Sequence, residues 1–453
     1  MLLLSYHFPP GQATGALRWQ QMAVVADQRG WALDVLTCHP DDLTTTDPGR
    51  LDSLPESVRV FGVRRDPTAI SAWEQRASRL IRRFRRRPAP GVPLARSAPA
   101  PLLDTREQMR WSATPGGLSR AWNGWRNFAD DWCWAGAAQR VAEQLIDGHD
   151  LIASCGPPHM PHIAASNVAS RTGTPHLMDM RDPWSLAPAL PREIASPLWY
   201  RLAESYEASA LSSAVVAVVN TQAHARALGA LHPEYADRII TVMNGCDRDP
   251  IPEVEESRFI VCYAGNIYID RDPRLVFRAV ARLVREQQLT PEQVGIELLG
   301  HVDSFGGIPI RELADSEGIS EFLTIYPRMP RNDALAIMAR AAVLVSLPQD
   351  IDLAIPSKVF EYTQFNAWLL ALARPSSATA DVLEGSGADV VLPDDEARIA
   401  EVIRQHYADF RRSGRPQPIN RNGRFDRTAQ ANYLFDILEE RVPLGERVKV
   451  QTA

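Results

Sequence analysis

The sequence has few cysteines, and their spacing does not suggest a disulfide framework or a metal site. The 453 residues include five cysteines, scattered along the chain at Cys38, Cys133, Cys155, Cys246 and Cys262. None of them forms the Cys-x-x-Cys spacing that is typical of zinc sites and redox motifs. Because the number is odd and the spacing irregular, we expect reduced thiols, as is usual in a cytosolic protein.

Long apolar runs are also missing. The start of the chain, Met1–Tyr6, is apolar for only a few residues before it reaches Pro9-Pro10, which is too short for a signal peptide. No later segment offers the ~18 consecutive apolar residues that a membrane-spanning helix needs. We therefore expect a cytoplasmic protein that does not cross a membrane.

Neither a basic excess nor a dinucleotide-binding glycine motif is present. The net charge is −6 at pH 7, whereas a dedicated nucleic-acid binder usually carries a basic excess, so we expect no nucleic-acid partner. The Gly-x-Gly-x-x-Gly pattern is absent, so we expect no dinucleotide cofactor. What remains is an ordinary globular composition, with 45% apolar and 23% charged residues, and a length that suits two or three domains.

The order of predicted elements indicates two α/β units. At the start, a strand over 1–5 leads through a Pro/Gly loop into a helix over 16–29 and a second strand over 33–38. This strand–helix–strand order implies a parallel sheet with crossover helices. A similar pattern restarts with a strand over 259–263, which leads into Ala264-Gly265-Asn266.

A linker is predicted between these two units. Asn244-Gly245 is a turn signal, and the charged stretch that follows it up to Ser257 contains two prolines. We therefore predict a Rossmann-like N-terminal domain over 1–245 and a Rossmann-like C-terminal domain over 258–420.

Residues 40–130 are less regular and rich in Pro, Arg and Trp, so we predict an irregular insertion there. Within it, the segment 76–96 contains the Arg-rich run 79–87, in which Leu80, Ile81 and Phe84 are interspersed. Two interpretations stay open, peripheral docking on anionic lipid at the inner face of a membrane and a solvated loop. Nucleic-acid binding is a third interpretation, but no aromatic interleaving or known fold supports it.

Six segments, in this order and spacing, resemble the family-4 retaining glycosyltransferases, which have the GT-B fold. The segments are Tyr6-His7-Phe8-Pro9-Pro10 with Gly15 and Arg18, Ser154–His159, Asp179–Trp184, Met243–Asp247, Tyr263–Asn266 and Ile355–Tyr362. Each is weak alone, whereas their order and spacing together are fairly specific. The resemblance covers most of the chain and is weakest between residues 40 and 130.

The resemblance implies two doubly wound domains that face a cleft, with the acceptor on the N-terminal domain and the donor on the C-terminal domain. It implies a hexosyltransferase-type enzyme that takes a sugar from a nucleotide-diphosphate sugar, with retention. The acceptor would be a glycan, a lipid-linked saccharide or a small molecule. It also implies that the segment 424–442 returns to the N-terminal domain. There, Thr428–Glu440 shows the spacing of an amphipathic helix, and we expect Leu434 and Phe435 to be buried.

The resemblance also implies roles for residues of the donor site. Arg271 and Lys358 would hold the departing diphosphate, and we take them as the catalytic candidates. Glu361 resembles the glutamate that accepts hydrogen bonds from the ribose diol. The full set of donor-binding candidates is Gly15, Gly265, Asn266, Arg328, Met329, Ser357 and Glu361.

Structural alternatives to these roles stay open at this point. Glu361 could be a solvated helix carboxylate, and Lys358 an ordinary surface lysine. Arg271 could pair with Asp270 or Asp272 on a surface turn. Gly15 lies where a helix opens after the first strand and its loop, where it could serve a phosphate or only the turn.

Three residues are candidates for the acceptor side, because each lies in a loop that follows a predicted N-terminal strand. They are His159, Arg181 and Asp182. The alternatives are a structural histidine and an Arg–Asp pair that fixes the local backbone.

No essential metal or cofactor is predicted. Asp-x-Asp triplets occur at Asp247/Asp249, Asp270/Asp272 and Asp350/Asp352, and we interpret them as surface acids. The family's Gly-x-Pro turn after Tyr362 is absent, and Leu353 stands where the family carries a first glutamate. These departures bear on recognition of the donor sugar. They keep open the alternative of a non-catalytic protein of this fold. A nucleotide-sugar epimerase on the same architecture is a further alternative, which requires an acid/base set in the cleft that we do not identify in the sequence.

Overall fold

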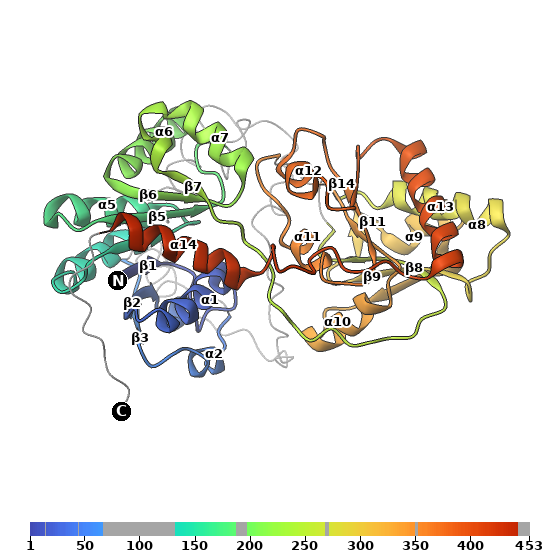
Figure 1. The fold of residues 1–453 in the computed structure, drawn as a ribbon, viewed down its shortest axis with the longest axis horizontal. Coiled ribbons are helices and arrows are strands. Elements are labelled where there is room, and N and C mark those ends of the chain that lie inside the picture. Colours follow the sequence, from blue (N-terminus) through green and yellow to red (C-terminus); the bar gives the residue numbers. More distant parts are fainter. Residues whose placement is uncertain are drawn as a thin grey trace, which may run out of the picture. The chain divides into compact units, whose positions relative to one another are not determined.

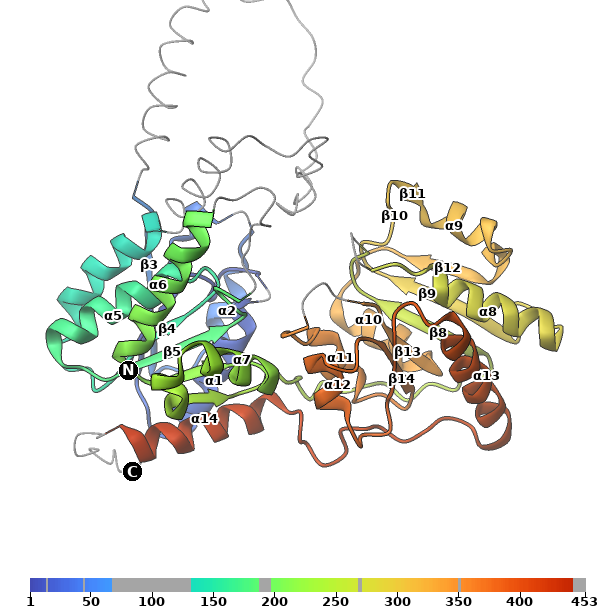
Figure 2. The same ribbon diagram turned by 90° about the horizontal axis from the view of Figure 1, so that it is seen from above.

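The computed structural model describes residues 1–13, 15–43, 45–66, 132–186, 197–267, 271–348 and 352–442. By its internal contacts the chain divides into two compact units. The first comprises Met1–Met180, Trp184–Ala217 and Val442–Ala453, and the second comprises Arg181–Pro183 and Val218–Arg441. Figures 1 and 2 show the elements of each unit from two directions. The Arg-rich segment 76–96 lies outside the described residues.

A seven-stranded sheet has the order β3-β2-β1-β4-β5-β6-β7. Its strands are β1 (Leu2–Ser5), β2 (Leu33–Cys38), β3 (Val58–Val63), β4 (Ile152–Cys155), β5 (His176–Arg181), β6 (Ala214–Val219) and β7 (Ile239–Thr241). The pairs β1–β2, β1–β4, β2–β3 and β4–β5 are parallel. The helices between these strands include α1 (Gly15–Gln28), η1 (Pro40–Asp42), α2 (Gly49–Asp52), α5 (Met160–Thr172), α6 (Pro197–Ser213), α7 (Gln222–Leu231) and η2 (Pro233–Arg238).

The central strands of this sheet are buried on both faces. Every residue of β1 and β2 is buried, which explains why Leu2–Leu4 form an uninterrupted apolar run in a parallel sheet. Helices α5 and α6 pack side by side (Figure 2). The chain leaves β1 for β2 on one side and reaches β4 on the other, so the strand order reverses between β1 and β4.

The prediction of an irregular insertion from residue 40 onward is wrong for its first part. Residues 58–63 form the edge strand β3, which pairs with β2 from Leu33↔Val58 to Cys38↔Val63. Arg59 lies in this strand at a solvent-exposed position, where its guanidinium binds the buried Asp34 on β2 at 2.5 Å. The ion pair of Arg59 therefore holds the edge strand β3 against its neighbour β2.

A six-stranded sheet lies within the second unit and has the order β12-β9-β8-β13-β14-β15. Its strands are β8 (Phe259–Ala264), β9 (Val294–Leu299), β12 (Leu323–Tyr326), β13 (Val343–Ser346), β14 (Trp368–Leu372) and β15 (Asp389–Val391). A small antiparallel pair joins β10 (Ser304–Phe305) to β11 (Ile308–Pro309). The helices are α8 (Arg274–Gln287), α9 (Ile310–Ser316), η3 (Ser320–Phe322), α10 (Arg331–Arg340), α11 (Ser357–Tyr362), α12 (Ala378–Leu383), α13 (Glu396–Ser413) and α14 (Arg427–Arg441).

Strand β8 shows how this sheet builds a core on each face. Phe259, Val261 and Tyr263 belong to one apolar cluster, together with residues of α8, α9 and α13. The alternate residues Ile260, Cys262 and Ala264 belong to a second cluster, together with residues of α10, α11 and α12. Helices α8 and α13 lie side by side in both views (Figures 1 and 2). The sheet is therefore covered on both sides, as in a doubly wound α/β domain.

The segment between β7 and β8 lies beside the segment that precedes α14. Cys246 and Asp426 form an isolated parallel bridge, and the N–H of Cys246 donates to the carbonyl oxygen of Phe425 at 2.8 Å. The guanidinium of Arg427 binds Asp247 at 2.6 Å. Residues 247–257 have no regular secondary structure and lie within the second unit, so their role as a linker between domains stays a prediction.

Helix α14 matches the amphipathic segment that the sequence predicts. Ala431, Leu434, Phe435 and Leu438 are fully buried, and neither Leu434 nor Phe435 belongs to the two clusters around the six-stranded sheet. The predicted domain boundaries, and the return of 424–442 to the N-terminal domain, stay predictions. The contact-based division falls within β6 rather than at residue 245.

Across the parts of the chain that the structure describes, no helix is both long enough and apolar enough to span a bilayer.

Candidate functional site

Two loops meet at the point where the strand order of the six-stranded sheet reverses. The chain passes from β8 to β9 on one side, whereas β13 lies on the other side of β8. The residues after β8 and those between β13 and α11 therefore leave the sheet at adjacent carboxyl ends. In open α/β sheets this is where ligands bind, and most of the predicted donor-binding residues lie here.

The loop after β8 allows an unusually close approach of Lys358. The N–H of Gly265 donates to the carbonyl oxygen of Leu299 at 2.8 Å. A Cβ atom at Gly265 would lie 2.6 Å from Tyr263 Oη and 3.1 Å from Lys358 Cε. Only glycine therefore leaves room for the lysine stem beside this loop.

A second glycine supports the same loop from β9. Gly300 has a φ of +119°, and a Cβ atom there would lie 2.4 Å from the carbonyl oxygen of Gly265. The N–H of Gly300 donates to the carbonyl oxygen of Tyr326 at the end of β12. The ends of three neighbouring strands are thus held close together.

Arg271 is fixed beside the same loop by neutral oxygen atoms. Its Nη1 donates to Tyr263 Oη at 3.2 Å and to the carbonyl oxygen of Asn266 at 3.3 Å, and Tyr263 Oη donates to that carbonyl at 2.8 Å. The alternative in which Arg271 pairs with Asp272 is not observed, because Asp272 binds Arg274 at 2.6 Å. Asp270 lies outside the described residues.

Lys358 and Glu361 lie three residues apart on α11, and Arg271 is close enough to affect the pKa of Lys358. Burial lowers the pKa of the Lys358 ammonium from its ordinary value of 10.5, while Glu361 raises it and Arg271 lowers it further. Lys358 thus lies near both the Glu361 carboxylate and the Arg271 guanidinium. Lys358 is half-buried, so the interpretation as an ordinary surface lysine does not hold.

Tyr362 attaches α11 to the end of β8. Its hydroxyl accepts a hydrogen bond from the N–H of Ala264 at 2.8 Å and donates one to the carbonyl oxygen of Ala264 at 3.0 Å. The Tyr362 side chain is fully buried. This contact fixes the helix that carries Lys358 and Glu361 against the strand that carries Gly265.

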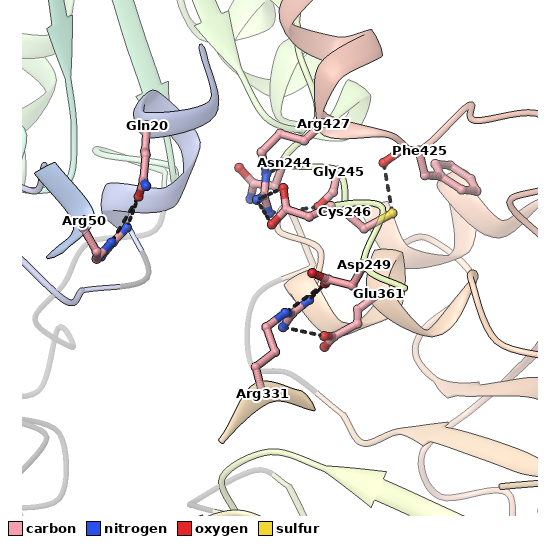
Figure 3. A network of polar contacts seen from close by, with 11 residues as sticks. Gln20, Arg50, Asn244, Gly245, Cys246, Asp249, Arg331, Glu361, Phe425 and Arg427 are labelled. Atoms are coloured by element: carbon pink, nitrogen blue, oxygen red, sulfur yellow. Dashed lines mark hydrogen bonds and ion pairs between the residues drawn. The ribbon is translucent and has the colours of Figure 1, made fainter. Parts of the chain in front are cut away.

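Glu361 is paired with an arginine that the sequence analysis did not single out. Glu361 Oε1 lies 2.9 Å from Arg331 Nη1, at the start of α10. Arg331 Nε donates to Asp249 Oδ2 at 2.8 Å, and Arg331 Nη2 also binds this oxygen. Figure 3 shows the guanidinium between the two carboxylates. Since the partners come from three distant parts of the chain, spacing could not have revealed Arg331.

The remaining donor candidates of the second unit differ in their exposure. Asn266 is exposed, and its backbone carbonyl oxygen accepts the hydrogen bond from Tyr263 Oη. Ser357 is exposed at the first position of α11. Arg328 is exposed between β12 and α10, whereas Met329 is half-buried and packs on the core beside α10 and α11.

The aspartates of the three Asp-x-Asp triplets, where they are described, are bound to arginines. Asp247 binds Arg427 and Asp249 binds Arg331. Asp272 binds Arg274, and Asp352 binds Arg374 at 2.8 Å. Among the described residues no cluster of three or more His, Cys, Asp or Glu could hold a metal ion.

In the first unit, Gly15 is the first residue of α1, as predicted. One turn later, the buried Arg18 binds Asp179 on β5 through Nε at 2.9 Å. Trp19 Nε1 donates to the same carboxylate at 2.9 Å. Arg18 and Asp179 thus fix α1 to the sheet, and this accounts structurally for two residues of the matching segments.

His159 lies immediately before α5, in the loop that follows β4. Its ring stacks on Trp184, with centroids 5.0 Å apart and an interplanar angle of 15°. A Cβ atom at Gly156 would lie 2.6 Å from His159 Nδ1 and from His162 Nε2. The loop after β4 is therefore packed tightly around two imidazoles and one indole, with glycine at the narrowest point.

Arg181 is the last residue of β5, whereas the sequence suggested that it lies in the loop after this strand, and Asp182 follows it. Arg181 is buried and has a φ of +53°, a conformation that is uncommon outside glycine. The Asp182 side chain is exposed. The proposed role of these two residues toward an acceptor stays a prediction.

No protein-family model matches the sequence, and no curated protein matches it. Solved structures match over nearly the whole chain. HepE of Anabaena in complex with UDP-glucose is 13% identical, with a TM-score of 0.57 over 97% of this chain and 100% of that chain. Sucrose-phosphate synthase of Thermosynechococcus elongatus is 12% identical, with a TM-score of 0.58 over 97% and 98%. The apo lipopolysaccharide outer core galactosyltransferase WaaB is 9% identical, with a TM-score of 0.57 over 97% and 99%.

At such low identities these matches show the fold. Two Rossmann-like parallel α/β sheets, together with these structures, confirm the predicted GT-B fold.

Proposed function

We propose that the protein is a glycosyltransferase that binds the nucleotide-diphosphate part of a sugar donor at the carboxyl end of the six-stranded sheet. The observation that carries this proposal is the pair of cations beside the Gly265 loop. Arg271 donates to Tyr263 Oη and to the Asn266 carbonyl, and Lys358 Cε packs closely against Gly265. Glu361 lies three residues after Lys358 on α11. A donor of this kind presents a ribose diol and a diphosphate, and these residues offer a carboxylate and two cations.

The chemistry of sugar transfer requires positive charge near the leaving diphosphate. Negative charge develops on the diphosphate as the bond to the sugar breaks, and fixed cations stabilise it most when they are already in place. Arg271 is held by Tyr263 and by the Asn266 carbonyl. Lys358 is held beside Gly265 by close packing. Glu361 would accept hydrogen bonds from the ribose hydroxyls.

We further propose a hexosyl donor, retention of configuration and membership of family 4. The six sequence segments that resemble family 4 support the family. Of the similar structures, HepE is in complex with UDP-glucose and WaaB is a galactosyltransferase. We propose a glycan, a lipid-linked saccharide or a small molecule as the acceptor. It would lie near His159, Arg181 and Asp182, since His159 lies in the loop after β4, Arg181 ends β5 and Asp182 follows it.

We also propose that transfer needs no metal ion. Lys358 and Arg271 can supply the positive charge that a metal would give. The aspartates Asp247, Asp249, Asp272 and Asp352 each bind an arginine in the structure. Turnover should persist in a chelator. Loss of turnover in the chelator that magnesium or manganese restores would contradict this proposal.

The decisive experiment is a donor assay on the full chain. A panel of UDP-, GDP-, ADP- and TDP-sugars is incubated with the protein, and release of the nucleoside diphosphate and the fate of the sugar are measured. We expect slow hydrolysis of one donor, faster with the true acceptor. Tight nucleotide binding without turnover would favour a non-catalytic protein, and isomerisation of the sugar would favour an epimerase. Absence of binding to every nucleotide would refute the donor site.

A further inference from the structure

We propose that Arg331 is a positioning residue for the donor ribose, and that it links the ribose-binding carboxylate of Glu361 to Asp249 in the segment between β7 and β8. The inference rests on the proposed function, because it assigns a role at the same donor site. It adds two residues, Arg331 and Asp249, that none of the matching sequence segments includes.

The geometry places one guanidinium between two carboxylates (Figure 3). Arg331 Nη1 lies 2.9 Å from Glu361 Oε1. On its other edge, Arg331 Nε donates to Asp249 Oδ2 at 2.8 Å, and Nη2 binds the same oxygen. All three residues belong to the second unit, so the arrangement is a property of one compact part of the chain.

The exposure of the three side chains shows which of them needs support. The Glu361 side chain is 14% exposed, Asp249 is 25% exposed and Arg331 is 52% exposed. A carboxylate as buried as Glu361 loses part of its hydration, so a fixed cation beside it offsets this loss. Burial alone would lower the pKa of Arg331, but Asp249 and Glu361 raise it above its ordinary value.

Arg331 leaves Glu361 free to bind a diol. An ionised carboxylate offers about four acceptor positions on its two oxygen atoms. Arg331 occupies one of these through Oε1, and two ribose hydroxyls can use the others. The pair therefore does not block the donor, and it fixes the direction in which the remaining lone pairs point. A carboxylate that is already oriented loses less conformational entropy when the ribose binds.

Asp249 acts on Glu361 only through Arg331. It lies in the linker, where no helix or strand holds the backbone, and it binds the Nε edge of the guanidinium. Replacing Asp249 should leave Arg331 paired with Glu361 but less fixed in orientation. The structure thus assigns to a linker residue an effect on ribose recognition, and this effect should be smaller than that of Arg331 itself.

The test compares nucleotides with and without the ribose diol on the full-length protein. UDP, GDP and ADP are titrated by calorimetry, and the tightest of them is compared with its 2′,3′-dideoxy analogue. We expect the wild-type protein to prefer the ribose form by about 10-fold or more, as for the loss of hydrogen bonds to a charged group. We expect Arg331→Gln to reduce this preference to about 3-fold or less, and Asp249→Asn to reduce it by a smaller factor.

Two controls separate positioning from general destabilisation. Arg331→Lys keeps the charge and should restore part of the preference. Arg278 is a half-exposed arginine on α8, and it binds Glu317 at 2.9 Å. The variant Arg278→Gln should leave the preference for the ribose form unchanged. Melting temperatures test whether each variant is folded. If Arg331→Gln does not fold, the ribose preference of Asp249→Asn decides whether the inference stands.

The outcomes distinguish this inference from the proposed function. If the wild-type protein prefers the ribose form and both Arg331→Gln and Asp249→Asn keep that preference in full, the role of Arg331 is refuted while the donor site stands. If the wild-type protein binds none of the three nucleotides, or binds the ribose and dideoxy forms equally, the ribose assignment fails and this inference fails with it.

Discussion

The hydroxyl of Tyr362 forms two hydrogen bonds to the backbone of a single residue, Ala264. It accepts from the N–H at 2.8 Å and donates to the carbonyl oxygen at 3.0 Å. Ala264 is the last residue of β8, and on its β13 side the strand pairing is found at Val261 and Cys262. A side chain on α11 therefore completes the strand at the point where the candidate donor loop begins.

The first prediction follows from this contact. Tyr362→Phe leaves the Ala264 N–H and carbonyl buried without these partners, which should lower the free energy of unfolding by about 1–3 kcal/mol. Urea unfolding of the two proteins measures the difference. Tyr407→Phe is a suitable control, because the Tyr407 ring packs on Phe259 and no hydrogen bond of its hydroxyl is found in the described ranges. An equal decrease in the free energy of unfolding for both variants would show that the two hydrogen bonds of the Tyr362 hydroxyl do not stabilise the fold.

The second prediction concerns the space beside the donor loop. In Gly265→Ala the new methyl group would lie 2.6 Å from Tyr263 Oη and 3.1 Å from Lys358 Cε, so the Tyr263 ring must shift and Lys358 must give way slightly. We expect a loss of stability of about 1–3 kcal/mol and weaker nucleotide binding. Gly295→Ala in β9 is the control, since its Cβ would lie 3.7 Å or more from its neighbours. Wild-type nucleotide affinity in Gly265→Ala would contradict the placement of Lys358 in the site.

The third prediction tests the carboxylate itself. Glu361→Ala should weaken nucleoside diphosphate binding by about 1–3 kcal/mol, the range for losing a charged hydrogen-bond partner. Glu317→Ala removes a carboxylate of similar exposure that binds Arg278 and should not change binding. Calorimetric titration measures both. If Glu361→Ala binds the nucleotide as the wild-type protein does and melts at the same temperature, Glu361 is not the ribose ligand.

The fourth prediction concerns pH and Lys358. Burial lowers the pKa of Lys358 below 10.5, so this lysine should lose its proton at a lower pH than an ordinary lysine. Nucleotide affinity should therefore fall as the pH rises toward 10.5. In Lys358→Arg the guanidinium stays charged, and the affinity should stay flat over the same range. A parallel fall in both proteins would assign the effect to another group.

The same shift has a consequence for stability, with a definite sign. Below the folded-state pKa, Lys358 is charged in both states, and its burial penalty destabilises the fold in full. Between that pKa and 10.5 the unfolded chain binds the proton and the folded protein does not, so the free energy of unfolding rises with pH. We expect the stability difference between Lys358→Met and the wild-type protein to shrink over this interval in urea unfolding.

The fifth prediction concerns helix α14. Leu434 is fully buried, whereas the adjacent Tyr433 is 49% exposed. Leu434→Ala should cost about 2–5 kcal/mol, as for other large-to-small changes in a core, and Tyr433→Ala should cost far less. Thermal unfolding measures both. Hydrogen exchange on Leu434→Ala shows which strands lose protection, and protection lost only within residues 258–420 would contradict a return to the N-terminal domain.

Sequence patterns predicted the parts of this fold whose signals are local. The apolar runs of β1 and β8 and the spacing of Lys358 and Glu361 on one helix each involve a few adjacent residues. The strand β3 was missed because Arg59 looks like a surface charge in the sequence. Its partner Asp34 lies on β2, so the ion pair appears only in the folded sheet. Local signals therefore predict individual helices and strands, whereas pairing between strands determines which segments join the edge of a sheet.

The candidate site shows the same division. Gly265 and Glu361 could be predicted because they lie in short segments that resemble a known family. Arg331 could not, because its two partners lie far from it in the sequence, in the linker and on α11. Tyr362 belongs to a matching segment, but its role depends on the strand end that it reaches. Partners that meet only through the fold leave no pattern in the chain.

The pairing of the linker with the segment before α14 means that these parts should stay together after the covalent chain is cut. Residues 250–257 have no regular structure and offer several exposed positions to a protease. On one side of such a cut, Cys246 and Asp247 are bound to Phe425 and Arg427, which lie on the other side. A nicked molecule would therefore run as two bands on a denaturing gel and as one species on a native sizing column.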